Sequence, residues 1–226
     1  MSASLLTPNS SPPADTVTHT PEEPRWLKVA REMSAMAQTG LTFCKDPFDR
    51  QRYQRLRELS ALLLAQDSEE DYAAILDSLN RDYGYATPKV DVRGAAFRDG
   101  RVLLVRELTD GLWTLPGGWA DVNQSPRACV EREIFEESGF TATALKLAAV
   151  YDYQKRNRPH ARESIYKMFF LCELTGGEAR PSNETSDVAF HARDRLPPLS
   201  QGRSTAAQIE RMFEHHENRG LATDFD

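Results

Sequence analysis

Apolar side chains in the first third of the chain recur at helical spacing, in three segments between residues 24 and 86. Each segment is bounded by residues that start or stop helices. We expect Gly40 to end the first helix, Asp46-Pro47 to open the second, a capping box over 68–71 to precede the third, and Gly84 to end it. The positions expected to face inward are Trp26, Val29, Ala30, Met33 and Met36 in the first helix, Tyr53, Leu56, Leu59, Leu62 and Leu63 in the second, and Tyr72, Ile75, Leu76 and Leu79 in the third. The pattern predicts a small helical domain over 24–86, whose apolar stripes serve core packing or, as the alternative, dimerisation.

From Pro88 onward, strand-like and helical patterns are mixed along the chain. Strands are expected at 90–97, 101–106, 142–153 and 164–174, with Asp99-Gly100 as a two-residue hairpin turn and 113–115 leading into a glycine loop. Helices are expected at 125–138 and 205–215. The pattern predicts a mixed α/β domain over 88–226.

The helix expected at 125–138 gathers its acidic residues on one face. Residues three and four apart are neighbours on a helix, so Glu133, Glu136 and Glu137 fall within one narrow arc. Because like charges repel, such an arc favours a bound cation, and hard divalent ions suit carboxylate oxygens best. The alternative is a solvated acidic helix on an acidic protein.

Less polar residues flank this acidic arc, Val130 and Ile134 on one side and Ala128 and Phe135 on the other. We therefore expect the carboxylates at the bottom of a groove between two packed surfaces. Further signals are a Ser125 N-cap, Pro126 at the first helical position, Gly139 at the C-terminal left-handed position, and a loop of Pro116, Gly117 and Gly118 whose backbone can approach a ligand closely.

This segment resembles the Nudix box, whose pattern is G-x5-E-x7-R-E-U-x-E-E-x-G-U, with U a bulky aliphatic or aromatic residue. The chain matches it with Gly118, Arg132-Glu133-Ile134, Glu136-Glu137 and Gly139-Phe140. One defining position differs, because Gln124 stands where the pattern has its first glutamate. A match over 23 residues is highly specific. The departure removes one negative charge, so we expect weaker metal binding with activity retained.

The resemblance implies metal-assisted hydrolysis of a diphosphate, with Mg²⁺ or Mn²⁺ as cofactor. By the family pattern Glu133, Glu136 and Glu137 are metal ligands, and Arg132 is placed to orient Glu136. Many family members use a further acid from a later loop as ligand or base. Glu184 is the candidate here, with an ordinary solvated loop residue as the alternative.

The segment from Ala37 to Leu59 is similar to the N-terminal domain of a bacterial Nudix subgroup. That subgroup includes dimeric pyrophosphatases acting on CDP-choline or ADP-ribose. The resemblance therefore implies an α/β/α sandwich preceded by a small all-helical domain, and a homodimer.

Composition is that of an ordinary soluble globular protein, with 27% charged and 40% hydrophobic residues. The net charge of -6 argues against broad nucleic-acid binding. Three scattered cysteines form neither a disulfide framework nor a metal-knuckle spacing. No apolar run has the length to span a bilayer, and no signal-peptide pattern is present, so we expect a cytoplasmic protein with a flexible leader over 1–23.

Basic residues are the candidates for holding the substrate diphosphate, although each one taken singly is more often a surface charge. The loop after the strand expected at 142–153 carries four of them within six positions, which favours an anion there. Beside the glycine loop, Trp119 is expected to pack inward, with stacking on a base as the alternative. The candidates are Arg93, Arg106, Lys155, Arg156, Arg158, His160 and Arg203, together with the backbone of Gly117 and Gly118.

Two functions remain open. The first is a Mg²⁺-dependent pyrophosphatase acting on a nucleoside diphosphate linked to a small moiety. The second is a non-catalytic Nudix-like nucleotide sensor whose helical domain relays ligand binding to a partner. Retention of three metal carboxylates favours the first.

If Gln124 limits the charge of the metal site, Gln124→Glu should lower the Mg²⁺ concentration needed for half-maximal hydrolysis. The measurement is turnover against Mg²⁺ concentration for both proteins. An unchanged Mg²⁺ dependence would refute this interpretation of Gln124.

Overall fold

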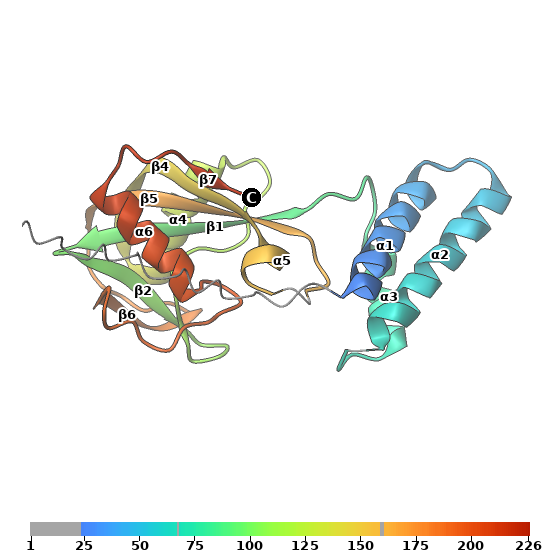
Figure 1. The fold of residues 1–226 in the computed structure, drawn as a ribbon, viewed down its shortest axis with the longest axis horizontal. Helices are drawn as coiled ribbons and strands as arrows, with labels where there is room; N and C mark the ends of the chain where they lie inside the picture. The colour runs from blue at the N-terminus through green and yellow to red at the C-terminus, as the bar shows by residue number, and fades with distance from the viewer. Residues whose placement is uncertain (1–23, 67, 159–160) are drawn as a thin grey trace, which may run out of the picture.

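The computed structural model describes residues 24–66, 68–158 and 161–226. Helices α1 (Arg25–Phe43), α2 (Pro47–Ala65) and α3 (Tyr72–Arg81) form the helical part at one end of the molecule (Figure 1). Their shared core consists of Leu27, Ala30, Ala61, Leu64, Ile75 and Leu79. The leader over 1–23 lies outside the described residues. No helix among the described ranges is long and apolar enough to cross a bilayer.

Aspartates cap two of these helices. The Asp46 carboxylate accepts hydrogen bonds from the N–H groups of Phe48 and Asp49, and Pro47 takes the first position of α2 as expected. The capping box expected over 68–71 is wrong in its detail. Asp71 is the N-cap of α3, accepting from the Ala74 N–H at 2.8 Å, and the helix begins directly after it.

Part of the apolar stripe expected to face inward is exposed. Val29 and Met36 of α1 are 47% and 52% exposed, and Leu59 and Leu62 of α2 are 37% and 44% exposed. The shared core buries one side of these stripes and leaves these four side chains outside it. The helical part therefore keeps an open apolar surface.

Gly40 does not end the first helix, which continues to Phe43. Its role is steric instead. A Cβ placed on Gly40 would lie 2.4 Å from the nearest atoms of the Tyr53 ring in α2. The glycine therefore permits the close crossing of α1 and α2.

The second part of the chain is built on a mixed sheet, ordered β3-β2-β1-β5-β4-β7, with β6 pairing with the other edge of β2. Its strands are β1 (Lys89–Arg98), β2 (Arg101–Glu107), β3 (Trp113–Thr114), β4 (Phe140–Asp152), β5 (Ile165–Gly177), β6 (Thr185–Ala192) and β7 (Asp224–Phe225), and its helices are α4 (Pro126–Ser138), α5 (Tyr153–Arg156) and α6 (Ala206–Glu217). The strands and helices expected from the sequence are all present, and α5, β6 and β7 were not expected.

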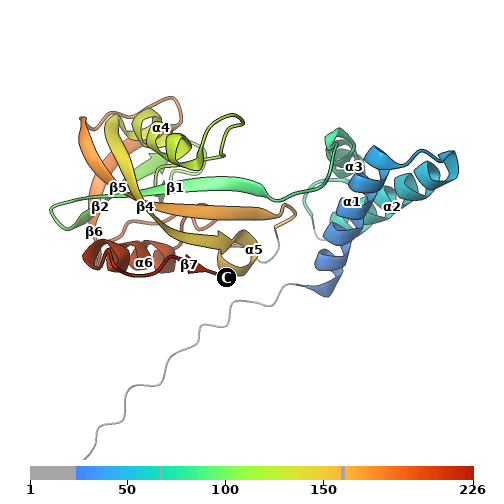
Figure 2. The ribbon, with the colours of Figure 1, turned by 90° about the horizontal axis from the view of Figure 1, so that it is seen from above.

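Helices α4 and α6 cover opposite faces of the sheet (Figure 2). Val130 and Ile134 of α4 pack in one core cluster, and Ile209, Met212 and Phe213 of α6 pack in the other. The expected α/β/α sandwich with an N-terminal helical part is confirmed. Strand β1 pairs in parallel with β5 at the centre, and its run from residue 91 to 96 is buried throughout.

Helix propensity alone would make Gly40→Ala stabilising by about 1 kcal/mol. Because the added methyl group meets the Tyr53 ring, we expect a loss of about 1–3 kcal/mol instead. Thermal and urea unfolding measure the difference. In a Tyr53→Ala background the same change should become neutral or stabilising, and equal effects in both backgrounds would contradict this packing argument.

Candidate active site

The glycine loop is held against β1 and lies beneath α4. Val92 donates its N–H to the Gly118 carbonyl at 2.8 Å, and Gly94 donates to the Pro116 carbonyl at 2.9 Å. Gly117 has φ 140°, and a Cβ there would lie 2.0 Å from the Val92 carbonyl oxygen. Only glycine fits this position. The loop is thereby fixed as the floor between β1 and the acidic helix.

Helix α4 has the caps that the sequence predicts. The Ser125 hydroxyl accepts from the Ala128 N–H, Pro126 takes the first helical position, and Gly139 adopts the left-handed conformation at φ 78°. The expected groove between two packed surfaces is wrong, because Ala128 and Phe135 are exposed, the latter by 44%. The sheet covers only the Val130 and Ile134 side, so the acidic arc lies at the edge of the buried face and opens outward.

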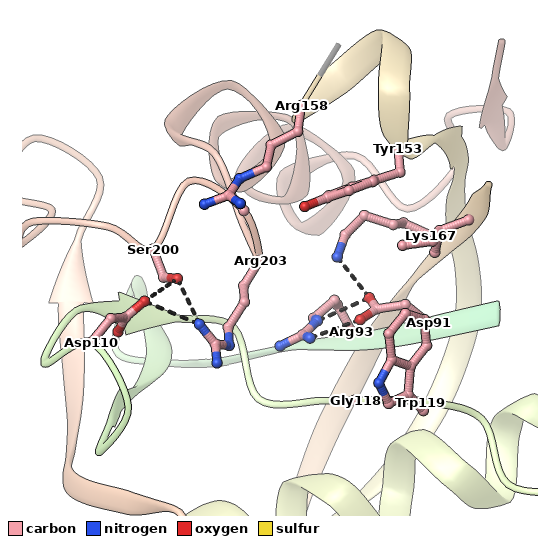
Figure 3. Close-up of a pocket in the computed structure, with 12 residues that line it drawn as sticks. Asp91, Arg93, Asp110, Gly118, Trp119, Tyr153, Arg158, Lys167, Ser200 and Arg203 are labelled. Carbon is pink, nitrogen blue, oxygen red and sulfur yellow. Dashed lines mark hydrogen bonds and ion pairs between the residues drawn. The ribbon is translucent and has the colours of Figure 1, made fainter. Parts of the chain in front are cut away.

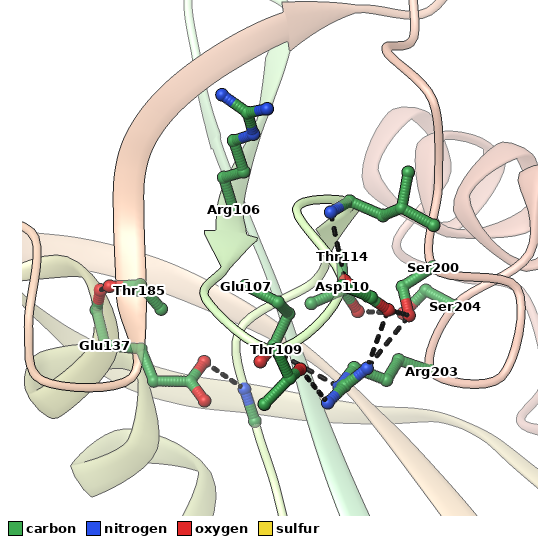
Figure 4. Close-up of polar contacts among 12 residues, drawn as sticks. Arg106, Glu107, Thr109, Asp110, Thr114, Glu137, Thr185, Ser200, Arg203 and Ser204 are labelled. Atoms are coloured by element: carbon green, nitrogen blue, oxygen red, sulfur yellow. Dashed lines mark hydrogen bonds and ion pairs between the residues drawn. The ribbon is translucent and has the colours of Figure 1, made fainter.

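The three carboxylates of this arc differ in burial. Glu137 is 5% exposed and accepts the Gly117 N–H at 2.9 Å (Figure 4), and burial raises its pKa to about 8. Burial also raises the pKa of Glu133, whose side chain is 12% exposed. The Glu136 side chain is 53% exposed. Two of the three carboxylates are therefore short of compensating positive charge.

Arg132 is the cation that lies over this acidic face. It pairs with Glu133 Oε1 at 2.8 Å and with Asp121 Oδ2 at 2.8 Å, and it also pairs with Glu136. Its Nε donates to Gln124 Oε1 at 3.3 Å. In this arrangement no three His, Cys, Asp or Glu side chains within the described ranges gather closely enough to hold a metal ion.

The donor set nevertheless fits a hard divalent cation. All three groups offer carboxylate oxygens, and the raised pKa values of Glu133 and Glu137 show that more positive charge would stabilise their ionised forms. The Arg132 and Glu136 side chains are 29% and 53% exposed, so packing does not enclose this ion pair. Glu133, Glu136 and Glu137 are thus the residues that would hold the ion, and this role stays a prediction.

A further buried acid, Glu107, lies at the end of β2 and was missed from the sequence. Burial raises its pKa, although Arg203 pairs with its Oε1 at 3.0 Å. Arg203 also pairs with Asp110 Oδ2 at 3.0 Å (Figure 4). Glu184 is exposed and lies close enough to raise the Glu107 pKa further. Its expected role as ligand or base stays a prediction.

Beside the glycine loop lies a pocket of about 300 Å³ with a buried charge cluster in its wall. Asp91 lies between two cations (Figure 3), with Oδ2 2.8 Å from Arg93 Nη2 and Oδ1 2.8 Å from Lys167 Nζ. All three residues are at most 5% exposed. Burial opposes ionisation of Asp91, but the two cations lower its pKa overall. Burial lowers the pKa of Lys167 to about 8, and the nearby Arg93 adds to that effect.

With Arg158 and Arg203 also lining it, the pocket is cationic and suits an anionic ligand. Asp91 and Lys167 were not expected from the sequence. A charged pair two positions apart in an otherwise apolar strand, Asp91 and Arg93, was the available signal.

The predicted binding residues divide into two groups. Arg93 and Gly118 line the pocket, whereas Gly117 is buried below Glu137. Arg106 is exposed and donates to the Gly111 carbonyl, and neither it nor Lys155 is among the residues lining this pocket. His160 lies outside the described residues.

The inward packing expected for Trp119 is wrong. This side chain is 52% exposed and lines the pocket.

Comparison with known proteins decides the family. The NUDIX domain model matches residues 88–213. The chain belongs to the Nudix hydrolase family. Residues 24–79 of this Nudix protein match a model described as a UDP-X-like, N-terminal oligomerisation domain, so an assembly of several chains is indicated.

Two relatives match most of this Nudix chain, and a third matches a smaller share of it. A Bacillus subtilis protein, provisionally named an ADP-ribose pyrophosphatase, is 44% identical over 89% of this chain and 97% of its own length. A solved UDP-X diphosphatase is 37% identical with a TM-score of 0.59, covering 89% of this chain and 98% of that one. A Streptococcus suis ADP-ribose pyrophosphatase structure is 43% identical with a TM-score of 0.58, covering 62% of this chain and all of that one.

Replacement of Asp91 by Asn would leave Arg93 and Lys167 buried without an anionic partner. We expect Asp91→Asn to lower the free energy of unfolding by about 3–5 kcal/mol, measured by urea denaturation. The control is Glu210→Gln, which breaks an exposed pair with Arg193 and should cost about 0–1 kcal/mol. Equal losses in the two variants would show that Asp91 does not hold this cluster together.

Proposed function

We propose that this Nudix hydrolase is a Mg²⁺-dependent pyrophosphatase that splits the diphosphate of a nucleoside diphosphate linked to a small moiety. The observation that carries the proposal is a pair of neighbouring sites of opposite charge. The carboxylates of the acidic arc of α4 favour a bound cation, and the basic residues of the pocket across Gly118 favour a bound anion. A metal-bound diphosphate meets both demands. The similarity to proteins named ADP-ribose pyrophosphatase and UDP-X diphosphatase supports this substrate class.

Each group has a role in this proposal. Glu133, Glu136 and Glu137 would hold Mg²⁺, or Mn²⁺ in its place. The bound ion would neutralise diphosphate oxygens and lower the pKa of a water molecule for attack on phosphorus.

The protein's own cations complete the site. Arg158 and Lys167 face the pocket and would hold the diphosphate in place. Arg132, which pairs with Glu136 in the acidic arc, would orient that carboxylate. Glu107 and Glu184 are the candidates for the general base, and Glu107 is the more buried of the two.

The helical domain over 24–86 would join two chains into a homodimer, and the hydrolase domain over 88–226 would carry out the chemistry. The open apolar surface of α1 and α2, which includes Val29, Met36, Leu59 and Leu62, supports this division. The cytoplasmic location stays a prediction. Nothing in the comparisons favours the non-catalytic sensor.

Glu137→Gln tests the function, because it removes the charge of a ligand while keeping a side-chain oxygen that can accept the Gly117 N–H. We expect kcat to fall roughly 100-fold or more. The assay is Mg²⁺-dependent hydrolysis of ADP-ribose, CDP-choline and UDP-sugars.

The matched control is Glu131→Gln, on the same helix, where the side chain pairs with Arg127 and accepts the Ala144 N–H, which a glutamine oxygen can still accept. It should retain nearly full activity. If the wild-type protein binds nucleotides but hydrolyses none of these compounds, the sensor is the better description.

A further inference from the structure

A second and larger cavity lies between the helical domain and the Nudix domain. Its volume is about 680 Å³, within the range of small-molecule sites. It shares Trp119, Tyr153, Arg158 and Ile165 with the cationic pocket. Because the two cavities have these four residues in common, one ligand can extend from one into the other.

The helical domain supplies the apolar wall of this cavity. Trp26 and Leu27 come from α1, Leu64 from α2 and Ile75 from α3. The cationic pocket takes its charged lining, which includes Arg93, Lys167 and Arg203, from the Nudix domain. A ligand that extends through both cavities would therefore have an anionic part and a less polar part.

Two contacts hold the helical domain against the segment that follows α5. Arg162 Nη1 pairs with Glu70 Oε2 at 3.0 Å, and Arg31 Nη1 donates to the Ala161 carbonyl at 2.5 Å. Arg158, which lines both cavities, lies three residues before this contact. Arg158, Ala161 and Arg162 all line the larger cavity, so the residues that contact the helical domain belong to the same cavity wall as Arg158.

Trp119 stands where the two cavities meet. Its backbone is fixed, since it forms a β-bridge with Asp91 and the next residue, Ala120, donates to the Val90 carbonyl at 2.9 Å. The residue is nevertheless 52% exposed, with Lys89 Nζ 5.7 Å from the ring centroid. A large aromatic ring on a rigid backbone, open to a cavity, is suited to stacking on a planar ligand group.

We propose that the nucleobase half of the substrate occupies this interdomain cavity and stacks on Trp119, with Trp26 in the outer wall. The diphosphate would then lie over Arg158 and Lys167, and the small moiety would lie on the far side of the acidic arc. The helical domain then forms part of the substrate site and also the surface through which two chains associate. The inference rests on the proposed pyrophosphatase function.

The experiment compares two substrates on full-length protein with Mg²⁺. One is ADP-ribose, and the other is the same diphosphate with a methyl group in place of adenosine. Trp119→Ala should raise KM for ADP-ribose roughly 5- to 100-fold, the range expected for loss of base stacking, with little change in kcat. KM for the methyl compound should not change.

Three further variants test whether stacking on an aromatic ring causes the change in KM. Trp119→Phe should restore most of the affinity, because a stacking surface returns. Trp26→Ala should raise KM for ADP-ribose and not for the methyl compound, which a purely structural role of the helical domain would not produce. Phe225→Ala is the control, an aromatic residue 77% exposed on β7 that lines neither cavity, and it should leave both KM values unchanged.

Unchanged KM values in Trp119→Ala and Trp26→Ala would overturn the inference. An equal rise for both substrates would also overturn it, because the cavity would then hold the other half of the molecule. If wild-type protein hydrolyses neither compound, the function has failed, and AMP binding measured by calorimetry still tests the cavity. Weaker AMP binding in Trp119→Ala would support it, and equal binding would contradict it.

Discussion

The Glu137 carboxylate, buried against the Gly117 N–H, is the interaction on which the arrangement of this site depends. It joins the acidic helix to the glycine loop, and the loop is itself hydrogen-bonded to β1. A buried carboxylate with one backbone donor is costly to keep ionised, as its raised pKa of about 8 shows. The fold therefore holds a group in place that gains most from a cation beside it.

The surrounding charges compensate part of this negative charge. Arg132 pairs with Glu133 and Glu136 at the outer edge of the arc. On the other side of the loop the charge is reversed, because Asp91 compensates only one of its two buried cations. The acidic site and the cationic pocket thus lie on the two sides of the glycine loop. This arrangement suits a diphosphate with a bound metal ion, because the ion can lie at the acidic site and the phosphate oxygens in the cationic pocket.

Local features of the chain could be predicted from the sequence. Residues close together in the chain determine the caps of α4 and the Asp99-Gly100 turn, in which both residues have positive φ. A specific motif indicated the two faces of the sandwich. Features that depend on distant pairing could not. Gly40 lies within α1, and its small size serves contact with Tyr53, which lies in another helix. Lys167 becomes a partner of Asp91 only when β5 pairs with β1.

Trp119 shows the same limit at the candidate site. An aromatic residue beside a buried loop is expected to pack inward, yet the Trp119 backbone pairs with β1 and its side chain lines both cavities. The direct test of the central claim is a crystal structure of the protein with Mn²⁺, read by anomalous scattering. We expect a peak among the carboxylates of Glu133, Glu136 and Glu137, with the Arg132 ion pairs rearranged. A peak elsewhere, or none at millimolar Mn²⁺ with those pairs intact, would contradict it.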